Sequence, residues 1–211
     1  MGNAKAKCFW WNEAQADLSA SVFTSLLVNS IETTFTDQVP VIVYSDGCGY
    51  QNRISTMSNG LLNLAMKTQR EIPQKFLVKG HTQMECDSIH SLVDRKLKNV
   101  DIRLPSDYME ICRKSHSKPF PIEVEKVGFK FFRNNNSVET QRYSSIRPGN
   151  KKLDPKVTEI RALNYLPSGV TQFKLSFDEQ WENLPRSSTE IPVCLDVPNL
   201  FDSALKINGR K

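Results

Sequence analysis

Two polar segments, each directly after an apolar run rich in β-branched residues, carry the residue types that could do chemistry. The first, residues 44–53, reads Tyr-Ser-Asp-Gly-Cys-Gly-Tyr-Gln-Asn-Arg and follows the run from Val39 to Val43. A buried strand that ends in an Asp and opens into a glycine-containing turn presents a carboxylate at the carboxyl edge of a sheet. Asp46 is therefore the first candidate for binding a metal ion at such an edge.

The second polar segment follows the run from Gln74 to Lys79, which is also typical of a strand. Residues 80–90 read Gly-His-Thr-Gln-Met-Glu-Cys-Asp-Ser-Ile-His. If the two strands are adjacent, both segments reach the same edge of the sheet, where paired carboxylates suit a divalent ion such as Mg²⁺. The side chains that would then join Asp46 are His81, Glu85, Asp87 and His90.

The bulk composition is that of a globular protein without membrane-spanning or secreted character. The chain has 211 residues, of which 39% are hydrophobic and 24% are charged. No run approaches the roughly 20 apolar residues that a membrane span needs, and no apolar signal segment is evident. The five cysteines form no Cys-x-x-Cys pair. We therefore expect an intracellular protein in a reducing compartment, without a disulfide framework.

The net charge of +5 is concentrated downstream, because basic residues exceed acidic ones between Arg113 and Pro185. Such a segment suits contact with a phosphate backbone, although a solvated surface explains it equally well. The candidate nucleic-acid contacts there surround a Pro-Gly turn, and others follow Asp46. They are Arg147, Lys151 and Lys152 in the downstream segment, and Gln51, Asn52 and Arg53 in the turn, where Asn52 is also a candidate helix cap.

Apolar periodicity predicts alternating strands and helices in the first half of the chain. The strands are expected at 8–11, 39–45 and 74–79, and the helices at 16–33, 54–69 and 84–98. This order indicates an α/β fold with a mostly parallel sheet and right-handed crossovers. A single short strand before the first helix leaves the sheet thin, so we expect the sheet to lack its first strands.

Beyond residue 118 the pattern becomes rich in β-structure. Strands are expected at 123–132, 157–166 and 170–177, with a hairpin turn at Leu166-Pro-Ser-Gly-Val and a helical turn at 178–184. The segment after residue 185 is aperiodic and polar, which is typical of a flexible tail. The sequence therefore predicts an incomplete α/β domain over 1–118, a small β-rich module over 119–185 and a tail over 186–211.

The turn Ser45 to Arg53 and the segment Gly80 to His90 together resemble a family of transposon-derived domains of unknown function in animal genomes. Its members usually carry a Ser-Asp-x-Cys-x-Gly-Gln-Asn turn and a Gly-His-Thr…Asp…His segment. Trp11-Asn-Glu13 resembles their Trp-x-Glu position, and Ser145-Ile-Arg-Pro-Gly149 with Asp154-Pro155 resembles their downstream region. The chain departs from the family in having Tyr50 for a glycine and in lacking an upstream strand that carries an Asp.

The resemblance implies an RNase H-like fold of the DDE transposase and integrase type, acting on DNA in the nucleus with Mg²⁺ or Mn²⁺. In such enzymes, two divalent ions about 3.5–4 Å apart activate the attacking hydroxyl and stabilise the leaving oxygen. The resemblance then implies that Asp46 and Asp87 bind metal and that Glu85 and Glu13 are further catalytic acids. His81 and His90 would orient neighbouring groups through hydrogen bonds.

Several alternatives to this catalytic interpretation stay open. Asp46 is also suited to capping its own turn, and Glu85 and Asp87 are favourable at a helix N-terminus for electrostatic reasons alone. The two histidines with Cys48 and Cys86 have the donor types of a zinc site, although their spacing fits no familiar motif. A scaffold that binds nucleic acid or protein without catalysis, and a homo-oligomeric assembly, are both compatible with the sequence.

Overall fold

The main sheet of the protein has five strands, and one of its four strand pairs is parallel. The structure, a computed structural model, describes residues 5–35, 39–78, 85–116, 118 and 120–207. Strands β2 and β3 are parallel, whereas the pairs β3–β5, β5–β6 and β6–β7 are antiparallel. In sheet order the strands are β2 (Val43–Ser45), β3 (Ile72–Phe76), β5 (Ala162–Tyr165), β6 (Thr171–Lys174) and β7 (Glu182–Asn183).

The protein is therefore α/β, as predicted, but the prediction of a mostly parallel sheet is wrong. The parallel pair β2–β3 is joined by a crossover helix, as the sequence indicates. Strands β5 and β6 form the predicted hairpin, in which Gly169 has a φ of +82° that favours glycine. Because a tight hairpin can only join antiparallel strands, the addition of β5 and β6 beside β3 makes the sheet mixed.

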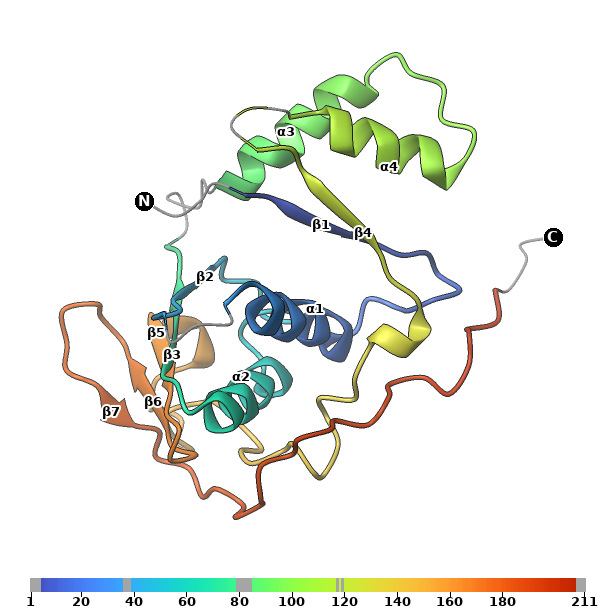
Figure 1. The fold of residues 1–211 in the computed structure, drawn as a ribbon. Helices are drawn as coiled ribbons and strands as arrows, with labels where there is room; N and C mark the ends of the chain where they lie inside the picture. Colours follow the sequence, from blue (N-terminus) through green and yellow to red (C-terminus); the bar gives the residue numbers. More distant parts are fainter. Residues whose placement is uncertain (1–4, 36–38, 79–84, 117, 119, 208–211) are drawn as a thin grey trace.

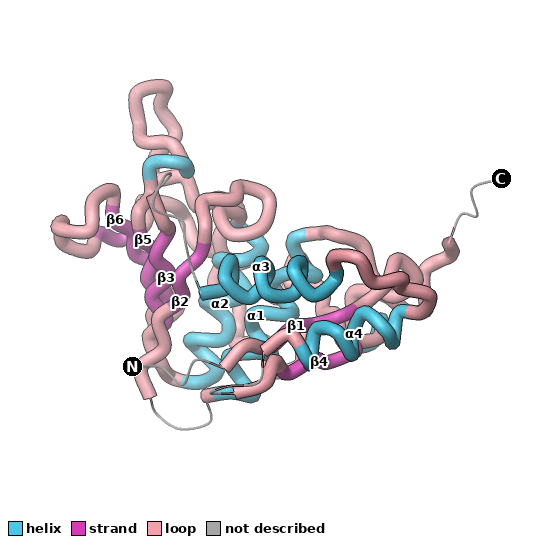
Figure 2. Tube along the Cα trace, turned by 90° about the horizontal axis from the view of Figure 1, so that it is seen from above, coloured by secondary structure: helices cyan, strands magenta, loops and turns pink. Residues whose placement is uncertain are grey.

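Helices α1 (Ala20–Thr34) and α2 (Ser55–Thr68) cover one face of this sheet (Figures 1 and 2). Every second residue of β3 is buried beneath them, namely Ile72, Gln74 and Phe76. Leu61 and Leu64 of α2 join the same core. The inward-facing side chains of β3, at every second position, therefore pack against the side chains of α2 that recur at helical spacing.

A second, two-stranded sheet lies apart from the first (Figure 1) and consists of β1 (Lys7–Trp10) and β4 (Glu123–Lys126) in parallel. Helices α3 (Glu85–Leu97) and α4 (Pro105–Lys114) pack on it through a small core that includes Val93 and Cys112. Phe9 of β1 instead packs in a core with Val22 of α1. β1 therefore pairs with the distant β4. The α/β alternation of the sequence predicts instead that β1 joins the sheet of β2 and β3, and the structure does not show that pairing.

Several element boundaries differ from the prediction for local reasons. The first helix begins at Ala20 rather than residue 16, because Oδ1 of Asp17 accepts the N–H of Ser19 in a tight turn before it. The strand expected over 123–132 ends at Lys126 and gives way to a 3₁₀ turn, η1 (Phe129–Phe131). A second 3₁₀ turn, η2 (Val157–Glu159), precedes β5, and β7 lies where a helical turn was expected.

Residues 186–207, expected to be part of a flexible tail, follow a defined path along the underside of the molecule in Figure 1. Backbone hydrogen bonds hold them to three distant segments, around residues 14, 132–134 and 142. The N–H groups of Thr189, Leu200 and Leu205 donate to the carbonyls of Arg142, Phe132 and Ala14, and the N–H of Asn134 donates to Pro198. The segment is ordered by partners elsewhere in the chain, which its own polar composition could not reveal.

The strands expected in a separate module over 119–185 share their sheets with the first part of the chain, since β5 pairs with β3 and β4 pairs with β1. Within the described residues, no helix combines the length and apolar character needed to cross a membrane.

Candidate functional site

The carboxylate of Asp46 lies in the turn directly after β2, as the sequence predicts. Its Oδ1 accepts hydrogen bonds from the N–H of Cys48 at 3.0 Å and from the side-chain amide of Asn52 at 2.5 Å. The turn is closed further because the N–H groups of Asn52 and Arg53 both donate to the carbonyl of Cys48. Asp46 is exposed. The turn therefore presents a fixed carboxylate to solvent, and Asn52 holds that carboxylate in place.

A buried polar network supports this turn from beneath, and sequence analysis missed it. Gln74 of β3 is fully buried and donates to the hydroxyl of Ser45 at 3.3 Å and to the carbonyl of Asn52 at 3.4 Å. The hydroxyl of Tyr165 donates to Oε1 of Gln74 at 2.7 Å. A glutamine at an inward position between Ile72 and Phe76 was the available signal, because a buried amide requires partners.

Tyr165 makes this network sensitive to alkali. Complete burial raises the pKa of its phenol well above the ordinary value. A group whose pKa is raised in the folded state stabilises the protein below the unfolded-state pKa, about 10 for tyrosine. That contribution falls as the pH rises above this value, because only the unfolded chain then releases the proton.

We expect Tyr165→Phe to lower the free energy of unfolding by about 1–3 kcal/mol at pH 8, since it leaves the oxygen of buried Gln74 without its donor. We also expect the variant to lose less stability than the parent between pH 9 and pH 11. Urea unfolding at these pH values measures both effects. Tyr50→Phe, at an exposed position, is the control, and an equal loss in both variants would contradict the expectation.

Arg53, a predicted nucleic-acid contact in this turn, has a buried side chain. It is only 7% exposed, and its Nη1 donates to the carbonyls of Val157, Thr158 and Ile160 at 3.1, 2.7 and 2.8 Å. The guanidinium also stacks on the ring of Phe76, 4.4 Å from its centroid. Burial and the positive charge of Arg161 lower the pKa of Arg53, and Asp46 partly offsets this. Arg53 therefore ties the turn to the segment before β5.

The first turn of α3 lies within electrostatic range of Asp46. Burial raises the pKa of the Cys86 thiol, and the charges of Asp87 and, more weakly, Asp46 raise it further. The Cys86 thiol therefore lies within electrostatic range of both carboxylates, whereas the groove beside Asp46 is lined by neither Cys86 nor Asp87. His81 lies outside the described residues, and for Glu85 the structure describes the backbone at the start of α3.

A groove of about 410 Å³ runs beside Asp46, between β1 and β2. Its floor is formed by apolar side chains of α1, and its walls by residues of β1, β2 and the turn. The residues that matter for the site are Lys7, Phe9, Phe23, Leu27, Asp46, Gln51 and Asn52. Gln51, a predicted nucleic-acid contact, therefore faces the same groove as Asp46.

Three predicted site residues, Glu13, Asp87 and His90, line no part of that groove. Glu13 is exposed in the turn after β1, and its neighbours Ala14 and Gln15 bond to Leu205 and Phe129 rather than to the turn of Asp46. His90 lines a separate groove of about 480 Å³ between α3 and the start of β1. The structure therefore brings none of these three residues into the groove of Asp46.

The three predicted contacts in the downstream basic turn differ in where their side chains lie. Arg147 donates to the carbonyls of Lys151 and Asp154 at 2.8 and 3.2 Å, which closes the loop on itself. Lys151 and Lys152 are exposed. Of the three predicted contacts in this turn, the two lysines therefore present their charges outward, whereas Arg147 stabilises the loop.

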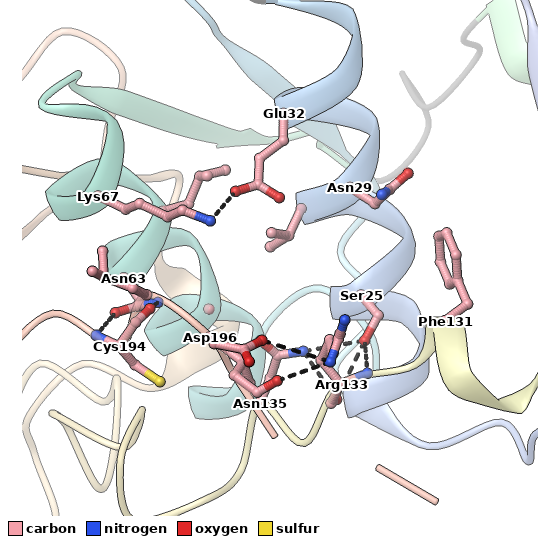
Figure 3. A pocket seen from close by; sticks show the side chains of 15 residues that line it. Ser25, Asn29, Glu32, Asn63, Lys67, Phe131, Arg133, Asn135, Cys194 and Asp196 are labelled. Atoms are coloured by element: carbon pink, nitrogen blue, oxygen red, sulfur yellow. Dashed lines mark hydrogen bonds and ion pairs between the residues drawn. The ribbon is translucent and has the colours of Figure 1, made fainter. Parts of the chain in front are cut away.

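A polar cavity of about 240 Å³ lies elsewhere, between α1, α2 and the C-terminal segment (Figure 3). Its charged side chains are already paired, because Lys67 contacts Glu32 at 2.8 Å and Arg133 contacts Asp196 at 3.8 Å. Asn63 binds the backbone of Cys194 through both of its amide atoms. The residues around this cavity therefore bind the C-terminal segment. Each charged side chain that lines it, within the described residues, is in an ion pair.

The described residues fit a divalent metal ion only in part. No group of three or more His, Cys, Asp or Glu side chains among them is placed to hold an ion. Within the same residues, Asp46 and Asp87 are not part of such a group, and Cys48, Cys86 and His90 do not form the alternative zinc site. No family model, curated protein or solved structure matches this chain significantly.

Proposed function

We propose that this chain is the α/β core of a transposon-derived, RNase H-like domain that processes DNA in the nucleus. The observation that carries the proposal is the fixed, exposed carboxylate of Asp46 at the end of β2, with the first turn of α3 close enough for both Asp46 and Asp87 to act on Cys86. A parallel β2–α2–β3 unit that delivers an acidic residue to the sheet edge can supply one of the carboxylates that metal-dependent phosphodiester chemistry uses.

The groove beside Asp46 supports the expectation of an incomplete sheet. β2 is the terminal strand of one sheet and β1 is a terminal strand of the other. Both strands border the groove, and apolar side chains of α1, among them Phe23 and Leu27, form its floor. Apolar helix surface between two strand edges is what an intervening strand would cover. Such a strand is also the natural source of a further acidic ligand.

In this proposal Asp46 would hold a Mg²⁺ or Mn²⁺ ion, and the chemistry that the ion would supply is activation of an attacking hydroxyl and stabilisation of the leaving oxygen. The contribution of this chain is a pre-oriented carboxylate. The Cys48 N–H and the Asn52 amide hold Oδ1 of Asp46, so that the group loses little side-chain freedom on binding an ion. Gln51, Lys151 and Lys152 are the remaining candidate contacts for the DNA backbone.

A binding scaffold without catalysis is the second candidate, and one observation favours it. The described residues contain no three-group cluster that would hold an ion. A domain that retained only its nucleic-acid surface would keep the turn of Asp46 for structural reasons, since that turn contacts buried Gln74 through the carbonyl of Asn52.

Titration calorimetry with MgCl₂ and MnCl₂ tests the catalytic proposal on the parent and on Asp46→Asn. The amide keeps an acceptor for the Cys48 N–H but removes the charge. We expect the variant to bind the ion at least about tenfold more weakly, because even groups that only orient metal ligands contribute 10–100-fold. Asp17→Asn is a matched control, since Oδ1 of Asp17 accepts the N–H of Ser19 in the same kind of turn at 3.0 Å.

Ion binding that Asp46→Asn weakens and Asp17→Asn leaves unchanged would support a metal site at Asp46. Absence of binding in a folded parent, or equal binding in both variants, would reject metal-dependent catalysis by this chain and leave the scaffold.

A further inference from the structure

The face of the main sheet that points away from α1 and α2 carries an aromatic and basic row that crosses four strands. The strand register places Tyr44 opposite Lys75, Lys75 opposite Ala162, and Ala162 opposite Lys174. Residues directly opposite each other in a sheet point to the same face. These four residues therefore form one line, and it lies on the outer face because Val43, Phe76 and Leu163, which alternate with them, belong to the core beneath the helices.

Aromatic rings close this row at both ends. The ammonium of Lys75 lies 5.7 Å from the ring centroid of Tyr44, and that of Lys174 lies 4.7 Å from the ring of Trp181. The row borders a groove of about 490 Å³ that Ile42 and Phe177 also line. Tyr44 is 56% exposed and Phe177 is 46% exposed. Tyr44 and Phe177 are therefore accessible to a ligand and Trp181 is partly so, and the two ammonium groups lie over the rings of Tyr44 and Trp181.

The charge of this groove is positive. Its described lining contains Lys75 and Lys174 and no Asp or Glu. In the adjacent acidic loop, residues 178–182, one carboxylate is bound to the backbone, since Oε2 of Glu179 accepts the N–H groups of Leu175 and Ser176. An anionic ligand with flat apolar parts would complement both the charge and the surface of the groove.

A second row of side chains on the same face is polar. The register places Asn164 opposite Gln172 and Gln172 opposite Asn183, and their amides are hydrogen-bonded in sequence at 3.3 and 3.1 Å. Asn164 is only 3% exposed, and its Oδ1 has no hydrogen-bond partner within the part of the chain that the structure describes. This oxygen is enclosed by the protein, and none of these three residues lines the groove, so the row supports the sheet beside the groove and does not contact a ligand there.

We propose that this outer sheet face binds single-stranded nucleic acid. Bases would stack on Tyr44 and Trp181, and phosphates would contact Lys75 and Lys174. Single-strand binding surfaces combine these two elements, because every base has a flat face for stacking and every nucleotide carries a negative phosphate. The inference rests on the proposed function only in taking nucleic acid as the partner, and it requires neither Asp46 nor a metal ion.

Fluorescence anisotropy with a labelled 12-nucleotide oligo(dT) in EDTA tests this assignment. An unlabelled duplex of the same length is added as the competitor. We expect Trp181→Leu and Tyr44→Leu each to weaken binding roughly five- to hundredfold, which corresponds to the loss of one stacked base. We expect Lys75→Gln with Lys174→Gln to reduce the steepness of the dependence of log K on log salt by about 1.4. Lys130→Gln with Lys206→Gln, two exposed lysines outside the groove, removes the same charge as a control.

Intrinsic fluorescence adds a readout of position. The chain has three tryptophans, Trp10, Trp11 and Trp181, and stacking of a base on Trp181 should quench an emission component that Trp181→Leu eliminates. Circular dichroism of each variant verifies that it is folded. Loss of oligo(dT) binding in the groove variants but not in the control supports the proposal.

Three results would overturn the proposal: no binding of oligo(dT) by the parent, equal binding by groove and control variants, or unchanged tryptophan emission. These results are distinct from failure of the catalytic proposal, which is measured by metal binding in the absence of nucleic acid.

Discussion

Replacing Arg53 by Met is expected to lower the free energy of unfolding by about 3–5 kcal/mol, or the melting temperature by roughly 10 °C. The variant removes the donor that the carbonyls of Val157, Thr158 and Ile160 share, and those carbonyls lie under the turn of Asp46. Three acceptors would lose a charged partner in a place that water reaches poorly. The stacking of the guanidinium on Phe76 would be lost as well. Urea or thermal unfolding followed by circular dichroism measures the effect.

Arg147→Met is the matched control for Arg53→Met. Arg147 also donates to three backbone carbonyls, at 2.8, 3.2 and 3.4 Å, but it is only partly buried and its loop lies at the surface. We expect a loss of about 1 kcal/mol, because solvent can replace the donor there. Equal stability losses in the two variants would show that Arg53 is not the anchor of the turn.

Phe132→Ala should have a destabilising effect of similar size, about 3–5 kcal/mol. Phe132 is completely buried, and its ring contacts those of Trp11, Phe131 and Phe201 with centroid distances of 5.9, 5.5 and 6.5 Å. Truncation would open a cavity between β1, η1 and the C-terminal segment. We expect that segment to become more susceptible to proteolysis than the rest of the chain, because Leu200 also donates its N–H to the carbonyl of Phe132.

Limited proteolysis with mass spectrometry, together with chemical unfolding, measures both consequences of Phe132→Ala. Phe177→Ala is the control, because Phe177 is 46% exposed and its truncation opens no internal cavity. A stability loss below about 1 kcal/mol in Phe132→Ala, or cleavage spread evenly over the chain, would contradict the role of Phe132 in fixing the C-terminal segment.

Much of the candidate site could be predicted because it depends on local sequence. The run before Asp46 forms β2, the helical stripe that follows forms α2, and β3 returns parallel to β2. Such a unit follows from periodicity and the handedness of crossovers. The position of Asp46 at the sheet edge and the hairpin between β5 and β6 are consequences of residues adjacent in sequence.

The roles of the buried polar residues could not be predicted, because their partners are distant in sequence. Arg53 looks like a surface cation, yet the three carbonyls that bind it lie 104–107 residues away. The sequence pattern places Gln74 in a strand but does not indicate its hydrogen-bond donor, Tyr165, which lies 91 residues away. No local pattern states which acceptor a buried donor will meet.

The sequence by itself determined the α/β class, the main helices and the acidic turn after β2, since each depends on apolar spacing within a few residues. Only the tertiary structure decided that β1 pairs with β4, that β5 joins β3 in an antiparallel pair, and that residues 186–207 are bound to loops around residues 14, 132–134 and 142. It also decided that Tyr44, Lys75, Lys174 and Trp181 gather on one sheet face. The physical reason is that the edge of a strand presents the same backbone N–H and C=O groups whatever its sequence. Which strand pairs with it therefore depends on the path of the whole chain.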